Sequence, residues 1–182
     1  AGHVERKAPR DRSGFWLESE LAHQWHEDYD MAAWAGYGQV GYIARDIKWE
    51  PSLSYRYAHF SGDDPNTNAY ERFDTLYSGG LDHWLQGIQI NKLLRQANRN
   101  THRVQFNVSP HAKLDLTLDY FHHTADETNN RGDSPILANL KNDDLGQEIQ
   151  FVSRWYASPK VMVQGIASTA FPGDAIKEAV PN

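Results

Sequence analysis

Three arginines, Arg56, Arg103 and Arg154, lie in stretches of sequence where polar and apolar residues alternate. A guanidinium group is planar and permanently charged, and it pairs with a carboxylate through two parallel hydrogen bonds. A ladder of such groups on one surface would attract a ligand that carries repeated carboxylates. The sequence leaves an alternative open, in which these arginines pair with neighbouring Asp and Glu side chains and only neutralise the surface.

Further polar residues share the alternating positions of the arginines. A period of two places successive side chains on opposite faces of a β-strand, so these residues would lie together on one face. If the apolar face contacts lipid, the polar face lines a water-filled lumen. The candidates for this wall, besides the three arginines, are Glu18, Glu20, Gln39, Gln105, Asp115, Asp119, Glu148, Gln150 and Gln164.

Seven segments have the alternation expected of strands and would position these residues. In residues 52–60, for example, Leu53, Tyr55 and Tyr57 alternate with small or polar residues. Residues 84–94 fit a strand, a short helix or an ordered loop, because their apolar residues match both periods. The seven segments are 15–25, 31–44, 52–60, 101–109, 114–122, 145–157 and 161–171.

The connections between these segments differ in length. Short turns at 45–51, 110–113 and 158–159 alternate with long polar loops after Phe60 and His122. This asymmetry is typical of outer-membrane barrels, which have short periplasmic turns and long external loops. The loop after Phe60 is therefore predicted to extend over the outer mouth, with extracellular candidates Asp63, Asp64, Glu71, Arg72 and Asp74.

Composition excludes several classes of protein. The chain of 182 residues has a net charge of -6 and no basic stripe, which argues against a nucleic-acid binder. Without cysteine it has no disulfide, zinc-thiolate site or thiol nucleophile. No apolar run approaches the length of a transmembrane helix, whereas strands hide their apolar half by alternation. The charged, patternless residues 1–13 are predicted to be an unstructured lead-in, and 14–182 to be one domain.

Neither a metal nor a catalytic site is predicted. The oxygen-rich loop at 63–71 lacks the spacing of an EF-hand and is expected to be a solvated turn, in which Glu71, Arg72 and Asp74 pair locally. Pairs of carboxylates on one strand face, such as Asp115 with Asp119, also occur in glycosidases, but alternating strands often bring carboxylates together. Tryptophans near strand ends suit either the aromatic girdles of a barrel or the core of a soluble sandwich: Trp25, Trp34, Trp49, Trp84 and Trp155.

Four stretches of sequence resemble the C-terminal part of the alginate export family: WEPSLSYRYAHFSGDDPNTNAYERFDTLYSGG, LDLTLDYFHH, DDLGQEIQ and FPGDAIKEA. The resemblance covers most of residues 31–179. It implies a bacterial outer-membrane barrel of about sixteen to eighteen strands that exports an anionic polysaccharide without catalysis or cofactor. The implied partners are outer-membrane lipid, the polysaccharide and periplasmic export machinery.

We therefore expect an all-β fold, an antiparallel up-and-down transmembrane β-barrel segment of about seven or eight strands that does not close by itself. The alternative is a soluble β-rich domain that binds or acts on carbohydrate. The two differ in where the apolar residues point. A barrel presents an apolar band to lipid, whereas a soluble sandwich turns its apolar faces inward.

Overall fold

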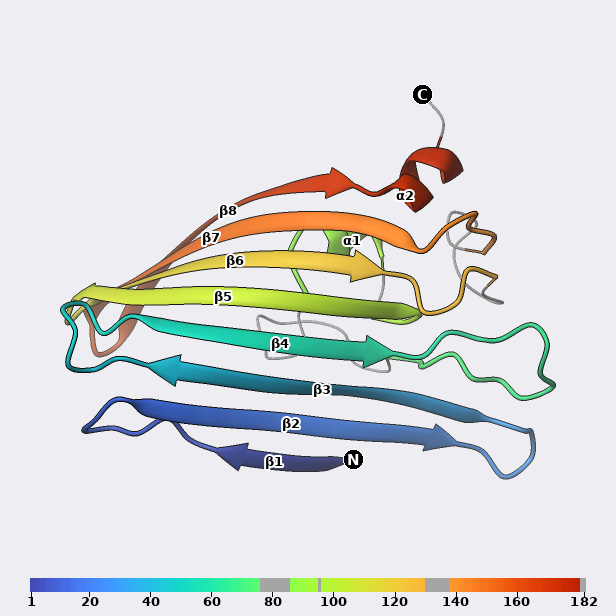
Figure 1. Cartoon of the computed structure of the whole chain (residues 1–182), viewed down its shortest axis with the longest axis horizontal. Coiled ribbons are helices and arrows are strands. Elements are labelled where there is room, and N and C mark those ends of the chain that lie inside the picture. Colours follow the sequence, from blue (N-terminus) through green and yellow to red (C-terminus); the bar gives the residue numbers. More distant parts are fainter. Residues whose placement is uncertain (76–85, 95, 130–137, 181–182) are drawn as a thin grey trace.

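The computed structural model contains one antiparallel sheet of eight strands, which follow one another in the order of the chain (Figure 1). It describes residues 1–75, 86–94, 96–129 and 138–180. The strands are β1 (Gly2–Arg6), β2 (Gly14–Trp25), β3 (Ala32–Ile43), β4 (Ser52–Phe60), β5 (Arg99–His111), β6 (Leu114–Thr124), β7 (Asp144–Ser158) and β8 (Val161–Pro172), and the helices are α1 (Ile90–Leu93) and α2 (Asp174–Ala179).

The connections confirm the predicted up-and-down arrangement. Residues 44–51, 112–113 and 159–160 form short turns at one end of the sheet, on the left of Figure 1. The long connections after β4 and β6 leave from the opposite end. Among the described residues β1 and β8 each pair with one strand only, so the sheet is open. An open sheet of this kind is consistent with part of a larger barrel.

Two parts of the chain differ from what the pattern suggests. Residues 2–6 form β1, paired with β2 from Gly2 opposite Leu21 to Arg6 opposite Leu17, so the prediction of an unstructured lead-in was wrong for them. All five are exposed, and no alternation of burial marks them; they are ordered by the backbone edge that β2 offers. Within 86–94 the ambiguous segment forms α1 and no strand, and the rest of it lies outside the described residues.

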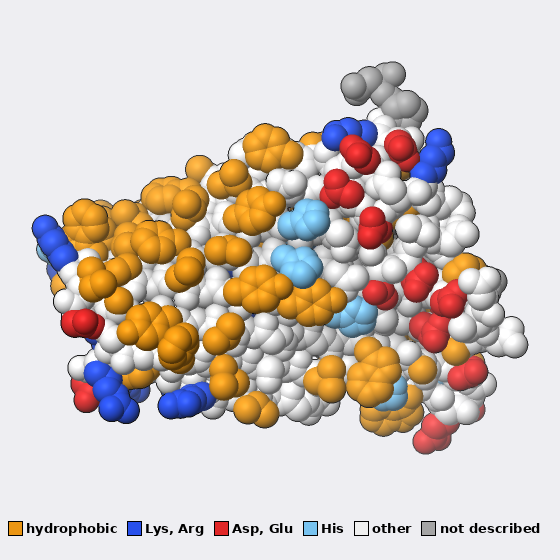
Figure 2. Space-filling view, in the orientation of Figure 1, with side chains coloured by type: hydrophobic (Ala, Val, Ile, Leu, Met, Phe, Trp, Pro, Cys, Tyr) orange, Lys and Arg blue, Asp and Glu red, His pale blue; other side chains and the backbone are white. Residues whose placement is uncertain are grey.

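The sheet has two chemically different faces. Burial alternates residue by residue along β3 and β4, as the period of two requires. We call the face against which α1 lies the inner face, and its opposite the outer face. The outer face carries large exposed apolar side chains such as Phe15, Leu53, Phe106 and Phe151. Figure 2 shows apolar side chains gathered over the short-turn half and the middle of this face, while most of the Asp and Glu side chains lie at the long-loop end.

A small apolar core lies on the inner face near the long-loop end. It contains Tyr37 and Phe60, with small alanines of β3 and β4 around them, and Phe73 from the following loop closes it. The rings of Phe60 and Phe73 are 6.0 Å apart between centroids. This core anchors the long loop to the sheet. Neither of the two short helices among the described residues is long and apolar enough to cross a membrane.

Candidate functional site: the inner face

Strand register places one polar residue of each of four neighbouring strands in a single row across the inner face. Glu18 pairs with Gln39, Gln39 with Arg56, and Arg56 with Arg103. The Arg56 side chain donates from Nε to Gln39 Oε1 at 2.8 Å, and its guanidinium carbon lies 4.3 Å from the centroid of the Tyr37 ring. The Tyr37 hydroxyl donates to Glu18 at 2.6 Å. The register of the strands thus brings Glu18, Tyr37, Gln39 and Arg56 into one connected network.

Arg56 lies on the predicted face but is only 2 % exposed. A guanidinium group stacked on an aromatic ring gains cation–π attraction, and Gln39 satisfies one of its donors. Its charge can act on the space beside the sheet through the low-dielectric wall, but its surface does not line that space. In this respect Arg56 differs from the other two arginines of the predicted ladder.

Arg103 is held by an ion pair and remains partly exposed. Its Nε donates to Asp119 Oδ1 at 2.9 Å, and Gln105 Nε2 donates to the same oxygen at 2.9 Å. The side chain of Asp119 is 1 % exposed, against 16 % for Arg103. The two charges neutralise each other, as the alternative to an arginine ladder predicts. The side chain of Arg103 nevertheless keeps more exposed surface than that of Asp119.

Arg154 lies nearer the short-turn end, opposite Asp115 on β6 and Gln164 on β8. Its Nε donates to Gln164 Oε1 at 3.2 Å, while Asp115 accepts a hydrogen bond of 2.7 Å from Ser109. Arg103 and Arg154 both border a small cavity on the inner face, of about 80 Å³. The other polar side chains that border it are Gln105, Thr117, Asp119, Gln150 and Gln164.

Glu148 is on the inner face, as its parity predicts, but its carboxylate does not face open space. The side chain is fully buried under residues 88–90, whose backbone N–H groups donate to it. Part of the first long loop, residues 88–90, therefore lies against the inner face of the sheet. Sequence patterning gives no signal for this contact, since residues 84–94 are compatible with a strand, a helix or a loop.

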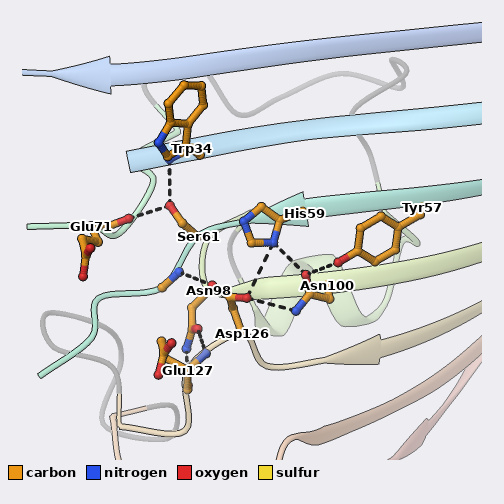
Figure 3. Close-up of polar contacts among 10 residues, drawn as sticks. Trp34, Tyr57, His59, Ser61, Glu71, Asn98, Asn100, Asp126 and Glu127 are labelled. Carbon is orange, nitrogen blue, oxygen red and sulfur yellow. Dashed lines mark hydrogen bonds and ion pairs between the residues drawn. The ribbon is translucent and has the colours of Figure 1, made fainter. Parts of the chain in front are cut away.

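The loop after β4 is tied to the strands by Ser61 and Asn98 (Figure 3). The Ser61 hydroxyl accepts from the backbone N–H of Trp34 at 2.9 Å and donates to the carbonyl of Glu71 at 2.5 Å. Asn98 exchanges two hydrogen bonds with the backbone of Glu127 in the second loop, at 2.7 and 2.9 Å. These contacts hold the two long loops together at one end of the sheet.

The acidic candidates of this loop make local hydrogen bonds. Asp63 accepts from the backbone N–H of Glu71 at 2.9 Å, and Asp64 accepts from the backbone N–H and side-chain amide of Asn66 at 2.8 Å each. Glu71 accepts from Thr67 at 2.8 Å. No group of three His, Cys, Asp or Glu side chains with the geometry of a metal site occurs in the described part of the chain.

The remaining two candidates of the loop lie beside Tyr70 and β2. Arg72 donates to the Tyr70 hydroxyl at 3.4 Å, and the backbone of Asp74 exchanges two hydrogen bonds with the side chain of Gln24. The loop is therefore tied to β2 as well as to itself. The contact with Gln24 joins residues that are 50 positions apart in the sequence.

Glu127 lies in the loop after β6, and its pKa is shifted by its surroundings. Partial burial raises the pKa of this carboxyl, and the charges of Asp126, Asp64 and Glu71 raise it further. Carboxylates from both loops therefore repel one another at the outer rim. This repulsion weakens the folded loops at pH values where Glu127 ionises.

Aromatic and histidine rings mark the boundary between the apolar band and the acidic end of the outer face (Figure 2). His23 stacks on Trp34 with 4.0 Å between ring centroids, and His102 lies opposite His122 on the neighbouring strand. Such rings suit the junction of an apolar and a wet environment. Of the predicted girdle residues, Trp84 lies outside the described residues.

These observations define a class of protein: part of an up-and-down β-barrel with a polar inner face and an apolar outer band. The chain belongs to the alginate export family, whose sequence profile matches residues 3–182. The family is one of transport proteins and not of enzymes, which gives this chain a role in the export of alginate or another polysaccharide. A search of curated proteins found no match to the chain.

Proposed function

We propose that this chain forms part of the wall of a bacterial outer-membrane channel through which an anionic polysaccharide such as alginate passes. The observation that carries the proposal is the separation of charge on the inner face. Asp119 and Arg103 both border the same cavity as Arg154, but the side chain of Asp119 is 1 % exposed and that of Arg103 is 16 % exposed. Guanidinium groups presented in this way match the carboxylates of a polyuronate.

The outer face supports a membrane location. Trp25, Phe15 and Leu53 are 68 %, 66 % and 56 % exposed. Figure 2 shows apolar side chains spread over much of the outer face. A soluble protein rarely exposes a contiguous apolar surface of this kind. A carbohydrate-binding sandwich would turn these side chains inward, so the outer face favours the channel over that alternative.

The partners follow from this orientation. Outer-membrane lipid covers the apolar band, the polysaccharide passes along the inner face, and the short-turn end faces the periplasm, where export machinery delivers the polymer. The long loops, with Asp63, Asp64 and Glu71, then extend outside the cell. Nothing in this path requires a cofactor or a catalytic residue.

The test is the ion preference of the full-length barrel in a planar bilayer, measured as a reversal potential in a salt gradient. Replacing Arg56, Arg103 and Arg154 together by Ala is expected to shift the preference toward cations, because three positive charges leave the wall. The matched control changes three exposed lysines outside the inner face, Lys113, Lys141 and Lys160. An unchanged reversal potential in the arginine variant, or an equal shift in the lysine variant, would contradict the proposal.

A further inference from the structure

The carboxylate of Glu148 binds the backbone of a segment that is distant in sequence. The side chain is 0 % exposed, and its two oxygens accept from the N–H groups of Ile88 at 2.7 Å, Gln89 at 3.1 Å and Ile90 at 3.0 Å. A buried ionised carboxylate needs donors, and the N–H groups at the start of a helical turn have no partner within the turn. Each group therefore satisfies the other, and neither is available to solvent.

Gly87 is the residue that permits this contact. Its φ angle is +78°, a conformation that residues with a side chain rarely adopt. A Cβ atom built on Gly87 would lie 2.6 Å from Glu148 Oε2 and 2.9 Å from Cδ. Any larger residue would both strain the backbone and push the carboxylate away. The turn at Gly87 therefore allows the backbone N–H groups of residues 88–90 to donate to the Glu148 carboxylate.

Two further contacts fix the same segment to the sheet. Arg99, which is fully buried at the start of β5, donates from Nη2 to Asn91 Oδ1 at 2.8 Å. Ile90 and Leu94 pack in a cluster with Leu145 of β7. Ala125 and Ala175 complete this cluster, so the loop after β6 and α2 also support the segment. The segment 86–94 is thus held by charge, hydrogen bonding and apolar contact.

The segment lies across the inner face and not beyond its rim. In Figure 1 α1 is behind β5, β6 and β7, on the side that the outer band does not occupy. Gly87 and Ile88 border the cavity that Arg103 and Arg154 also border. Register places Glu148 opposite Phe121, which in turn pairs with Arg103. Glu148 therefore lies at the same level of the sheet as Arg103.

We propose that residues 86–94 form a constriction of the lumen and that Glu148 is the positioning residue that fixes its width. This inference rests on the proposed function and assigns a size limit to the channel, because the segment narrows the lumen beside Arg103 and Arg154 and excludes wider solutes. Glu148 acts on the polymer only through the segment, since its own oxygens face the backbone N–H groups.

The experiment measures the size limit of the full-length barrel with neutral polyethylene glycols of increasing mass, which lower the single-channel conductance only if they enter the pore. Glu148→Gln removes the charge and turns an NH₂ group toward backbone donors, and Gly87→Ala displaces the carboxylate. Both are expected to shift the exclusion limit to larger polymers. Glu148→Asp keeps the carboxylate one methylene farther away and is expected to give a smaller shift in the same direction.

Two controls separate width from charge and from general damage. Glu20→Gln removes the same charge from the inner face of β2, where the carboxylate lies 3.9 Å from His3 Nδ1, so its effect reports charge alone. Gly38→Ala adds the same methyl group where nothing lies within 4 Å. Glu148→Asp keeps the experiment informative if Glu148→Gln does not fold.

The outcomes distinguish this inference from the proposed function. If the channel prefers anions but Gly87→Ala and both Glu148 variants keep the wild-type exclusion limit, the constriction is refuted and the proposed function stands. If the exclusion limit shifts as expected while the wild type shows no anion preference, the constriction stands and the ligand class is wrong. Equal shifts in Glu20→Gln or Gly38→Ala would also refute a specific role of Glu148.

Discussion

Removing the charge of Asp119 should have two opposite effects, one on stability and one on ion preference. Asp119 accepts from both Arg103 and Gln105 and is 1 % exposed, so replacing it by Asn leaves these two donors with an uncharged, weaker acceptor and the Arg103 charge without its partner. A hydrogen bond to a charged group contributes roughly 1.5–3 kcal/mol, and breaking a fully buried ion pair costs about 3–5 kcal/mol. Because Arg103 retains 16 % exposure and can rehydrate, we expect Asp119→Asn to cost about 2–4 kcal/mol.

The same substitution leaves the charge of Arg103 uncompensated beside the cavity. The anion preference of the channel should therefore increase while its stability decreases. The assays are urea unfolding of the full-length barrel in detergent, followed by tryptophan fluorescence, and reversal potentials of the refolded protein. The control is Asp174→Asn, because the Asp174–Lys177 pair on α2 has side-chain exposures of 68 % and 62 % and an exposed pair adds little stability.

A double-mutant cycle with Arg103→Met sharpens this prediction. If Asp119 acts through Arg103, its substitution should cost much less when Arg103 is already Met, because the charge that it compensates is gone. Equal costs in the two backgrounds, or a loss of stability without any gain in anion preference, would show that Asp119 does not act through Arg103.

Three further predictions concern the rim, the outer face and the core. Glu127→Gln should raise the melting temperature at neutral pH and leave it nearly unchanged at acidic pH. Because the pKa of Glu127 is raised in the folded protein, the wild-type stability falls as the pH rises from the ordinary glutamate range through the folded pKa. Equal stabilisation at both pH values would contradict this. Val104→Arg on the outer face should reduce folding stability in lipid by about 2–4 kcal/mol if it lies near the bilayer midplane. Gln105→Arg on the inner face should cost much less. Equal costs for the two variants in vesicle refolding would contradict the assignment of the faces. Phe60→Ala, at 0 % exposure, should destabilise the barrel by about 3–5 kcal/mol in urea unfolding, and a loss below about 1 kcal/mol would show that the Phe60–Phe73 contact does not anchor the loop.

Alternation in the sequence was enough to predict the strands that carry a full contrast between two faces. In β4 the exposed Leu53, Tyr55 and Tyr57 alternate with the buried Ser54 and Arg56, which is the pattern that a wall between lipid and water requires. β1 has no such contrast, because all of its residues are exposed and its order comes from the edge of β2. A strand stabilised only by backbone pairing leaves no period in its side chains.

The sequence predicted which side chains lie on the inner face, but not what those side chains contact there. Parity placed Arg103, Asp119 and Glu148 on one face, because side-chain direction follows from the period of the strand. Whether a residue on that face meets water or protein depends on a segment that comes from elsewhere in the chain. The contact between Glu148 and Ile88 joins residues that are 60 positions apart, and it is formed by backbone N–H groups that every sequence contains.

In the proposed channel, the arginines of the inner face guide a polymer of carboxylates through the lumen. The most direct measurement adds oligouronates to one side of a bilayer that holds the full-length barrel and records blockade of the single-channel current. We expect concentration-dependent blockade by oligouronates, little blockade by neutral oligosaccharides of the same length, and loss of the difference when Arg56, Arg103 and Arg154 are replaced by Ala. Equal blockade by charged and neutral oligosaccharides, or full blockade of the arginine variant, would contradict it.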